Sequence, residues 1–180
     1  MLFRSGFIES EKNLDHDGAA WVTGDSRIFC VAVVSSAAVV SGDAVVSGDA
    51  RVSGVAVVSG AARVTGDAWV TGVARIFGDA VVSGAAVVSG DAFVTDSARV
   101  SGAAVVSGAA DFAVISGFGR VFRTTTFFRC KDNLVRCKCG CFYGTVDEFR
   151  SKVRETHGNS KYAKEYLMIA DLMELHFKED

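Results

Sequence analysis

The feature that most constrains this chain is a six-residue repeat, Ala-x-Val-x-Gly-Asp, which keeps one frame from Ala20 to Gly108. One slot of the repeat is always Val or Ile, and the slot two residues earlier is always Ala except at Ser26. Side chains alternate between the two faces of a strand, so these two slots share one face. The Val or Ile slot contains Val22, Ile28, Val34, Val40, Val46, Val52, Val58, Val64, Val70, Ile76, Val82, Val88, Val94, Val100 and Val106.

Glycine usually follows two positions after this slot, where the chain must bend. Short units that cannot bury an apolar face alone must stack on one another, and a six-residue period is typical of a parallel β-helix. Fifteen repeats, three to a coil, predict five triangular coils of eighteen residues. The frame slips after Val106 and resumes with Ala113 and Ile115, which predicts a bulge at 110–112 and a sixth, less regular coil through Phe127.

The pattern divides the chain into three parts. Residues 1–18 are predicted to form an N-terminal cap, residues 19–128 the β-helix, and residues 129–180 a C-terminal module of one hairpin and two helices that caps the other end. The hairpin is expected from 126–130 and 134–139, around Asp132 and Asn133. Apolar residues of the N-terminal cap are Leu2, Phe3, Phe7, Ile8 and Leu14.

Two helices are predicted in the C-terminal module. Thr145 and Glu148 form a capping box, which indicates a helix that starts there and ends near Gly158. A second helix is expected over 160–177, with an apolar face that packs on the hairpin or the last coil. That face carries Tyr162, Tyr166, Ile169, Ala170, Met173 and Phe177.

The repeat resembles the left-handed β-helix of the hexapeptide-repeat transferase superfamily, which places a small residue four positions after an aliphatic one, as at Val52 and Ala56. The resemblance implies a left-handed coil, a trimer, acyl-CoA bound between subunits and a catalytic His on the coils. This chain has only His16, His157 and His176, all outside the regular coils. A general base must reach the proton that it removes. An acyltransferase that uses His16 or His157 across an interface therefore stays an alternative to a protein without enzymatic activity.

Outward-pointing residues eighteen positions apart should stack into stripes, and two stripes are largely apolar. A monomer rarely exposes this much apolar surface, so a homotrimer that buries both stripes is predicted, with β-propensity on a solvated face as the alternative. The predicted interface residues are Trp21, Val39, Val57 and Phe93 in one stripe and Val33, Trp69, Val87 and Val105 in the other.

The third stripe repeats a basic residue on alternate coils. Arg27, Arg63 and Arg99 should stand about 10 Å apart. This spacing suggests a site for a small anionic, nucleotide-like ligand. The alternative is simple charge pairing with the Asp residues of the preceding corner, such as Asp25 and Asp43, since exposed pairs carry little specific information.

Four cysteines cluster in the C-terminal module. Cys137, Cys139 and Cys141 alternate along a predicted strand, with Cys130 across the hairpin. Four thiolates can hold zinc, but structural zinc sites usually pair cysteines two to four residues apart. Small buried side chains are the simpler interpretation, and no other cofactor is expected.

Charge and hydropathy limit the function classes. The formal net charge is −2, which predicts no bulk attraction to nucleic acid or to an anionic membrane. No segment reaches the ~20 apolar residues of a membrane span, and residues 1–20 lack the pattern of a secretory leader. Five cysteines, four of them clustered, do not form the disulfide framework of a secreted protein in a chain of this length, so a reduced, cytoplasmic protein is expected.

The tail resembles the C-terminal module of small uncharacterised proteins of tailed phages and prophages. The resemblance rests on Cys139-Gly140-Cys141-Phe142-Tyr143-Gly144-Thr145, followed by Glu148-Phe149, Val153, His157 and Glu165-Tyr166, and on the Gly-Asp-Ala-Arg-Val-Ser-Gly repeat at 48–54. It implies a phage accessory role in the host cytoplasm. The sequence thus predicts a non-enzymatic oligomeric β-helix platform that binds a small anionic ligand or a host protein, with a structural virion or self-assembling protein as a further alternative.

Overall fold

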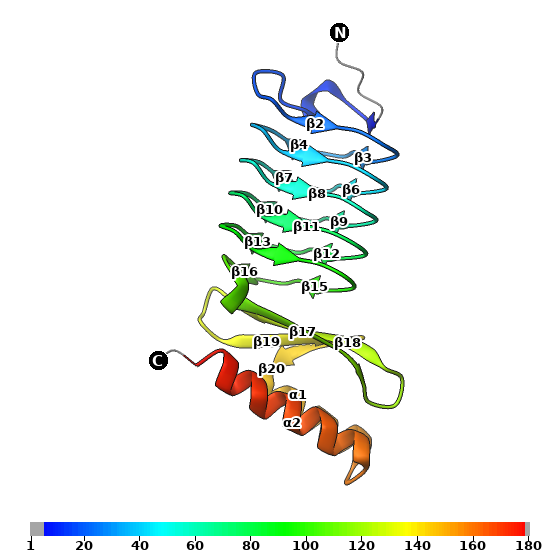
Figure 1. Cartoon of the computed structure of the whole chain (residues 1–180), viewed down its shortest axis with the longest axis vertical. Coiled ribbons are helices and arrows are strands. Elements are labelled where there is room, and N and C mark those ends of the chain that lie inside the picture. Colours follow the sequence, from blue (N-terminus) through cyan, green and yellow to red (C-terminus); the bar gives the residue numbers. More distant parts are fainter. Residues whose placement is uncertain (1–5, 179–180) are drawn as a thin grey trace. The chain divides into compact units, whose positions relative to one another are not determined.

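The computed structural model describes residues 6–178 and confirms the predicted fold class. The chain forms two compact units, Met1–Ala109 and Ala110–Asp180. The first is a parallel β-solenoid, and the second is an antiparallel sheet with two helices (Figure 1). Leu2 and Phe3 of the predicted N-terminal cap lie outside the described residues.

Three parallel sheets form the sides of the solenoid, and each strand pairs with strands one coil away (Figure 1). Sheet A contains β1 (Phe7–Ile8), β3 (Arg27–Ile28), β6 (Val45–Val46), β9 (Arg63–Val64), β12 (Val81–Val82) and β15 (Arg99–Val100). Sheet B contains β4 (Val33–Val34), β7 (Arg51–Val52), β10 (Trp69–Val70), β13 (Val87–Val88) and β16 (Val105–Val106). Sheet C contains β2 (Trp21–Val22), β5 (Val39–Val40), β8 (Val57–Val58), β11 (Arg75–Ile76) and β14 (Phe93–Val94).

The core of the solenoid is built as the repeat predicts. The second residue of each strand and the Ala before the strand point inward, and Val64 and Ala62 are fully buried. Backbone hydrogen bonds join each coil to the next: the Trp69 N–H donates to the Ala86 carbonyl at 2.9 Å and the Thr71 N–H to the Val88 carbonyl at 2.9 Å. Small and β-branched side chains therefore fill a narrow interior whose walls are tied coil to coil.

The glycine corners stack backbone on backbone. Gly66 has a φ of 70°, and a Cβ added to it would lie 3.0 Å from the backbone nitrogen of Gly84 in the next coil. Both the left-handed backbone and the close stacking favour glycine. Cys30, Ser36 and Asp96 take the same slot with positive φ, so a few corners accept a side chain at the cost of strain.

The N-terminal residues extend the solenoid as well as covering its first coil. Strand β1 pairs with β3, which gives sheet A its sixth strand. The short helix η1 (Glu11–Asn13) follows, and the buried Asn13 amide donates to the carbonyls of Cys30 at 3.0 Å and Ala32 at 2.8 Å. These bonds give a donor to two carbonyl groups of the first coil, of which that of Ala32 is buried.

Residues 113–128 do not form the predicted sixth coil. The 3-10 helix η2 (Ala109–Asp111) leads into β17 (Phe112–Phe118), which pairs antiparallel with β18 (Arg123–Arg129). The physical reason lies in the slots of the repeat. The corner slot of the continued frame holds Arg123 and Arg129 instead of Gly, and the aliphatic slot holds the bulky Phe127. The chain therefore extends where a coil would have to bend.

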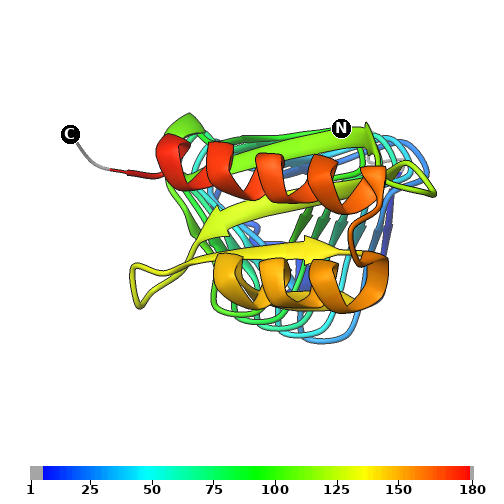
Figure 2. The same ribbon diagram turned by 90° about the horizontal axis from the view of Figure 1, so that it is seen from below.

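The C-terminal unit is a four-stranded antiparallel sheet in the order β17-β18-β19-β20 with both helices on one face. The predicted hairpin is confirmed as β18 and β19 (Val135–Cys139), whereas β20 (Phe142–Thr145) was not predicted. Figure 2 shows α1 (Val146–His157) and α2 (Lys161–His176) side by side. Their core contains Phe127, Cys137, Val146, Phe149, Val153, Ala163, Tyr166, Ile169, Ala170, Met173 and Phe177.

The predicted ends of both helices are confirmed. Thr145 caps α1 in a capping box with Glu148, Gly158 follows its last turn, and Ser160 caps α2. The Arg150 guanidinium joins the helices through ion pairs with Asp171 at 2.8 Å and Glu174 at 2.7 Å.

The predicted apolar face of α2 is buried except at Tyr162, which is 37% exposed. Within residues 6–178, neither helix has the length and apolar character that a membrane crossing requires.

We predict that Gly66→Ala lowers the free energy of unfolding by about 1–2 kcal/mol, because alanine disfavours the left-handed backbone and its Cβ meets the Gly84 backbone. Gly108→Ala is the matched control: this corner glycine does not have a positive φ, and its Cβ would meet only the Asp91 side chain, at 3.3 Å. Denaturant unfolding measures both variants. Equal losses would contradict the stacking argument.

The capping box predicts a pH dependence. The Thr145 N–H donates to Glu148 Oε2 at 2.7 Å, and this bond, followed by the Thr145 hydroxyl, lowers the pKa of Glu148 below its usual 4.5. A lowered carboxyl pKa contributes stability above pH 4.5 that is lost as the pH falls through the folded pKa. Lowering the pH below 4.5 should therefore reduce the melting temperature of the wild type more than that of Glu148→Gln, and thermal unfolding measures both. Parallel pH profiles of the two proteins would contradict this prediction.

Candidate functional site

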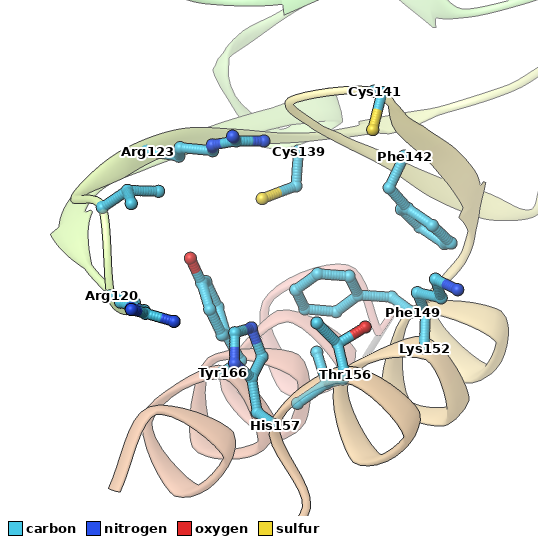
Figure 3. A pocket seen from close by; sticks show the side chains of 12 residues that line it. Arg120, Arg123, Cys139, Cys141, Phe142, Phe149, Lys152, Thr156, His157 and Tyr166 are labelled. Carbon is cyan, nitrogen blue, oxygen red and sulfur yellow. The ribbon is translucent and has the colours of Figure 1, made fainter. Parts of the chain in front are cut away.

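The C-terminal unit contains a pocket of about 340 Å³, formed between one end of its sheet and the two helices (Figure 3). Three cationic side chains line it, Arg120, Arg123 and Lys152. Its remaining lining is mainly apolar and aromatic, with Phe142, Phe149 and Tyr166. Concave sites of this kind, apolar with a few polar groups, are where small ligands usually bind.

Four elements bring these residues together. Arg120 and Arg123 come from the turn between β17 and β18 and from the start of β18. The end of β19 supplies Cys139, the following turn Cys141 and the start of β20 Phe142. Helix α1 contributes Phe149, Lys152, Thr156 and His157, and α2 contributes Tyr166. The residues of α1 lie along one side of the helix, because they are adjacent or three to four residues apart.

Two glycines make room for the pocket's side chains. Gly140 has a φ of 59° and lies against the Arg123 guanidinium, so any Cβ at this position would collide with that group. Gly119 has a φ of 75°, and a Cβ there would collide with the Tyr166 ring. The Gly119 N–H also donates to Glu165 Oε2 at 2.9 Å, which ties the β17–β18 turn to α2. The positions of Arg123 and Tyr166 thus depend on glycine at these two turns.

The electrostatics of the pocket are one-sided. No carboxylate of the described residues lines the pocket. Lys152 pairs with Glu155 at 3.0 Å, but within the described part of the chain no acidic side chain forms an ion pair with Arg120 or Arg123. Figure 3 shows Arg120 on one side of the cavity, Arg123 along the sheet with its guanidinium beside Cys139, and Lys152 on the side opposite Arg120. Among residues 6–178, the two arginines of the pocket therefore carry positive charge without a carboxylate in an ion pair.

Tyr166 belongs to the aromatic part of the pocket lining. Burial raises the pKa of Tyr166, and the adjacent Cys139 thiol raises it further. The phenol is therefore neutral near pH 7 and keeps its proton for a hydrogen bond. Its hydroxyl donates to the Phe118 carbonyl at 3.4 Å, which is longer than an ordinary O–H···O bond. His157 stacks on the ring, with centroids 5.8 Å apart.

The four thiols of the predicted zinc site are not brought together. Cys137 pairs with Phe127 across β18 and β19 and is fully buried beneath the helices. Cys130 lies on the opposite face of the sheet, next to Arg136. Burial raises the pKa of both thiols. Among residues 6–178, no group of three or more His, Cys, Asp or Glu side chains is placed to hold a metal ion.

One buried hydroxyl near the pocket has no partner. Thr125 pairs with Cys139 across the strands, so both side chains lie on the helix-covered face of the sheet. Its Oγ1 is buried and is the one side-chain oxygen or nitrogen of the described residues found both buried and without a hydrogen bond. A buried hydroxyl without a partner costs free energy, and its replacement by an apolar group would break no hydrogen bond.

The predicted stripes of the solenoid form as expected from the eighteen-residue spacing. Trp69 stacks between Arg51 and Val87 in sheet B, with Val33 and Val105 at the ends of that stripe. In sheet C, Trp21, Val39, Val57, Arg75 and Phe93 follow one another. Trp69 is 49% exposed and Phe93 48% exposed, so both aromatic side chains offer apolar surface to solvent.

The basic stripe does not converge on a site. Arg27, Arg63 and Arg99 lie in sheet A, separated by Val45 and Val81. A shallow hollow beside Arg27 also contains the carboxylates of Asp25 and Asp43. Parallel stacking repeats a residue at a fixed spacing and keeps side chains of successive coils side by side. The arginines therefore do not meet around one ligand-sized space.

Sequence reasoning missed Arg120, Arg123 and Lys152. The helical period of α1 does place Phe149, Lys152 and Thr156 on one side, which was a usable signal. No local pattern indicated that the β17–β18 turn and the β19–β20 turn would meet this side, because that depends on the antiparallel pairing of the unit.

Comparison with known proteins supports the repeat fold. A family model described as YdcK beta solenoid repeat matches residues 74–90, which lie within the regular coils. Neither the curated proteins nor the solved structures gave a match. The similarity therefore concerns the repeat and leaves the C-terminal unit, with its pocket, to be interpreted from its own geometry.

Proposed function

We propose that this protein is a non-enzymatic, oligomeric β-solenoid platform whose C-terminal unit binds a small anionic ligand. The observation that carries the proposal is the pocket that Arg120 and Arg123 line, where none of the lining residues that the structure describes is a carboxylate. Guanidinium groups bind phosphate and carboxylate through paired N–H donors, and a concave apolar wall strengthens their field.

The size of the pocket limits the ligand. A volume of about 340 Å³ is at the small end of ligand sites and fits one compact molecule. The pocket is a better candidate for anion binding than the basic stripe, because its cations face a shared cavity whereas Arg27 has carboxylate neighbours. Arg27, Arg63 and Arg99 are left as solvated positions of sheet A.

The platform part of the proposal is a homotrimer of solenoids. Its support is the outward apolar surface of sheets B and C, where Trp69 and Phe93 are about half exposed. Closed three-fold packing buries two faces of each triangular coil and leaves the third, sheet A, for solvent. The charged residues Arg27, Arg63 and Arg99 on sheet A agree with a solvated third face.

The cellular role is a proposal from the resemblance of the tail alone. A phage accessory protein in the host cytoplasm that sequesters a small anion, or blocks a host protein, stays a prediction. The acyltransferase and virion alternatives also stay predictions. For the acyltransferase, His157 lines the pocket, whereas His16 lies far from it in the chain.

Anion binding is tested by calorimetric titration with inorganic pyrophosphate. We expect saturable binding by the wild type and a loss of at least tenfold in affinity for Arg120→Gln with Arg123→Gln, since each charge-assisted contact contributes roughly 1.5–3 kcal/mol. Arg154→Gln is the matched control, an exposed arginine of α1 outside the pocket. Equal affinity in the double variant and the control would contradict the assignment of the site.

The trimer is tested by native mass spectrometry. We expect a single species of three chains for the wild type and monomers for Trp69→Lys with Phe93→Lys, because two lysines cannot be buried against neighbouring apolar faces. Val81→Lys, on sheet A, is the control and should stay trimeric, and circular dichroism checks that each variant is folded. A monomeric wild type would overturn this part of the proposal.

A further inference from the structure

The wall of the pocket is built from rings rather than from flexible aliphatic chains. Phe149 lies between Phe142 and Tyr166, with ring centroids 5.7 Å from each. The Tyr166 ring is held in turn by the stacked His157. Figure 3 shows these rings around the cavity, with the Cys139 thiol pointing into it. Fixed aromatic surfaces favour a flat, polarisable partner, since ring pairs add attraction beyond the area that they bury.

Tyr166 supplies a hydrogen-bond donor on this aromatic wall. Its hydroxyl has two weak partners in the protein, the Phe118 carbonyl at 3.4 Å and the Cys139 thiol. A ring nitrogen or carbonyl of a ligand could accept a shorter and stronger bond from it. A purely hydrocarbon ring would leave this hydroxyl with the weak partners that it already has. The wall therefore favours a heteroaromatic ring over a phenyl ring.

The charge of the ligand follows from the arginines. Arg120 and Arg123 supply two positive charges that no acidic side chain of the described residues pairs with, whereas Lys152 already pairs with Glu155. A phosphate monoester carries between one and a half and two negative charges near pH 7, which matches this pair better than a carboxylate does. Gly140 leaves free the space that the Arg123 guanidinium occupies.

We infer that the ligand of this pocket is a heteroaromatic ring joined to a phosphate monoester, with the ring against Phe149 and the Tyr166 hydroxyl and the phosphate at Arg120 and Arg123. A nucleoside monophosphate has this chemistry and a compact size. The inference rests on the proposed function, which assigns anion binding to the same pocket, and it adds which part of the ligand meets which wall.

The test is a calorimetric titration series on the full-length protein. The probes are the four ribonucleoside 5′-monophosphates, phenyl phosphate, ribose 5-phosphate, adenosine and inorganic pyrophosphate. We expect at least one nucleotide to bind about tenfold or more tightly than ribose 5-phosphate and phenyl phosphate, with adenosine weaker than AMP. Tyr166→Phe should weaken the binding of that nucleotide about fivefold, which corresponds to the loss of one hydrogen bond. It should leave the affinity for ribose 5-phosphate unchanged.

Tyr162→Phe is the matched control, because Tyr162 lies on the same helix and contacts His157 but does not line the pocket. If pyrophosphate and ribose 5-phosphate bind as tightly as every nucleotide, the ring inference fails and anion binding stands. If no phosphate-bearing probe binds, the proposed function itself fails, and the inference with it. If Tyr166→Phe and Tyr162→Phe behave alike while a nucleotide is preferred, the assigned role of the Tyr166 hydroxyl is wrong.

Discussion

The stacking of each coil on the next is the interaction on which the solenoid depends. Its strands are only two residues long, so no strand could persist by itself. Each coil acquires backbone partners only from the coils above and below, as in the bond from the Trp69 N–H to the Ala86 carbonyl. This repeated ladder requires corners with the same left-handed backbone conformation, and the glycines at Gly66 and Gly84 let the backbones approach closely enough to stack. The Ala and Val slots then fill an interior of constant width.

The same regularity makes the solenoid a poor place for a compact site. Residues at equivalent positions lie side by side at a fixed spacing, so Arg27 and Arg63 stand two coils apart with Val45 between them. A pocket needs side chains that approach from different directions. The antiparallel sheet and two helices of the C-terminal unit provide this, since Arg123, Lys152 and Tyr166 reach one space from a strand and two different helices. Repetition therefore suits the solenoid to broad faces, and the irregular unit suits a ligand.

Local features hold the pocket's shape. Gly140 and Gly119 leave space that any side chain would fill, and the Arg150 ion pairs hold α1 against α2. Thr125 is an exception, because its buried hydroxyl has no hydrogen-bond partner in the described part of the chain. It lies next to the pocket on the strand face shared with Cys139. We have no physical account of why a hydroxyl rather than a methyl group stands at this position.

The sequence by itself determined the solenoid, its corners, its outward stripes, the cap of the first helix and the approximate ends of both helices, because each of these follows from contacts at a short and constant spacing. The eighteen-residue period places Trp69 beside Val87, and Thr145 and Glu148 mark the start of α1 within one turn. Only the tertiary structure decided where the coils end and where the pocket forms. Residues 113–128 left the repeat frame to form long strands, because Arg123 and Phe127 occupy slots that need glycine and a small aliphatic residue. The meeting of Arg120, Lys152 and Tyr166 depends on antiparallel pairing and helix packing between distant segments, which no local pattern specifies.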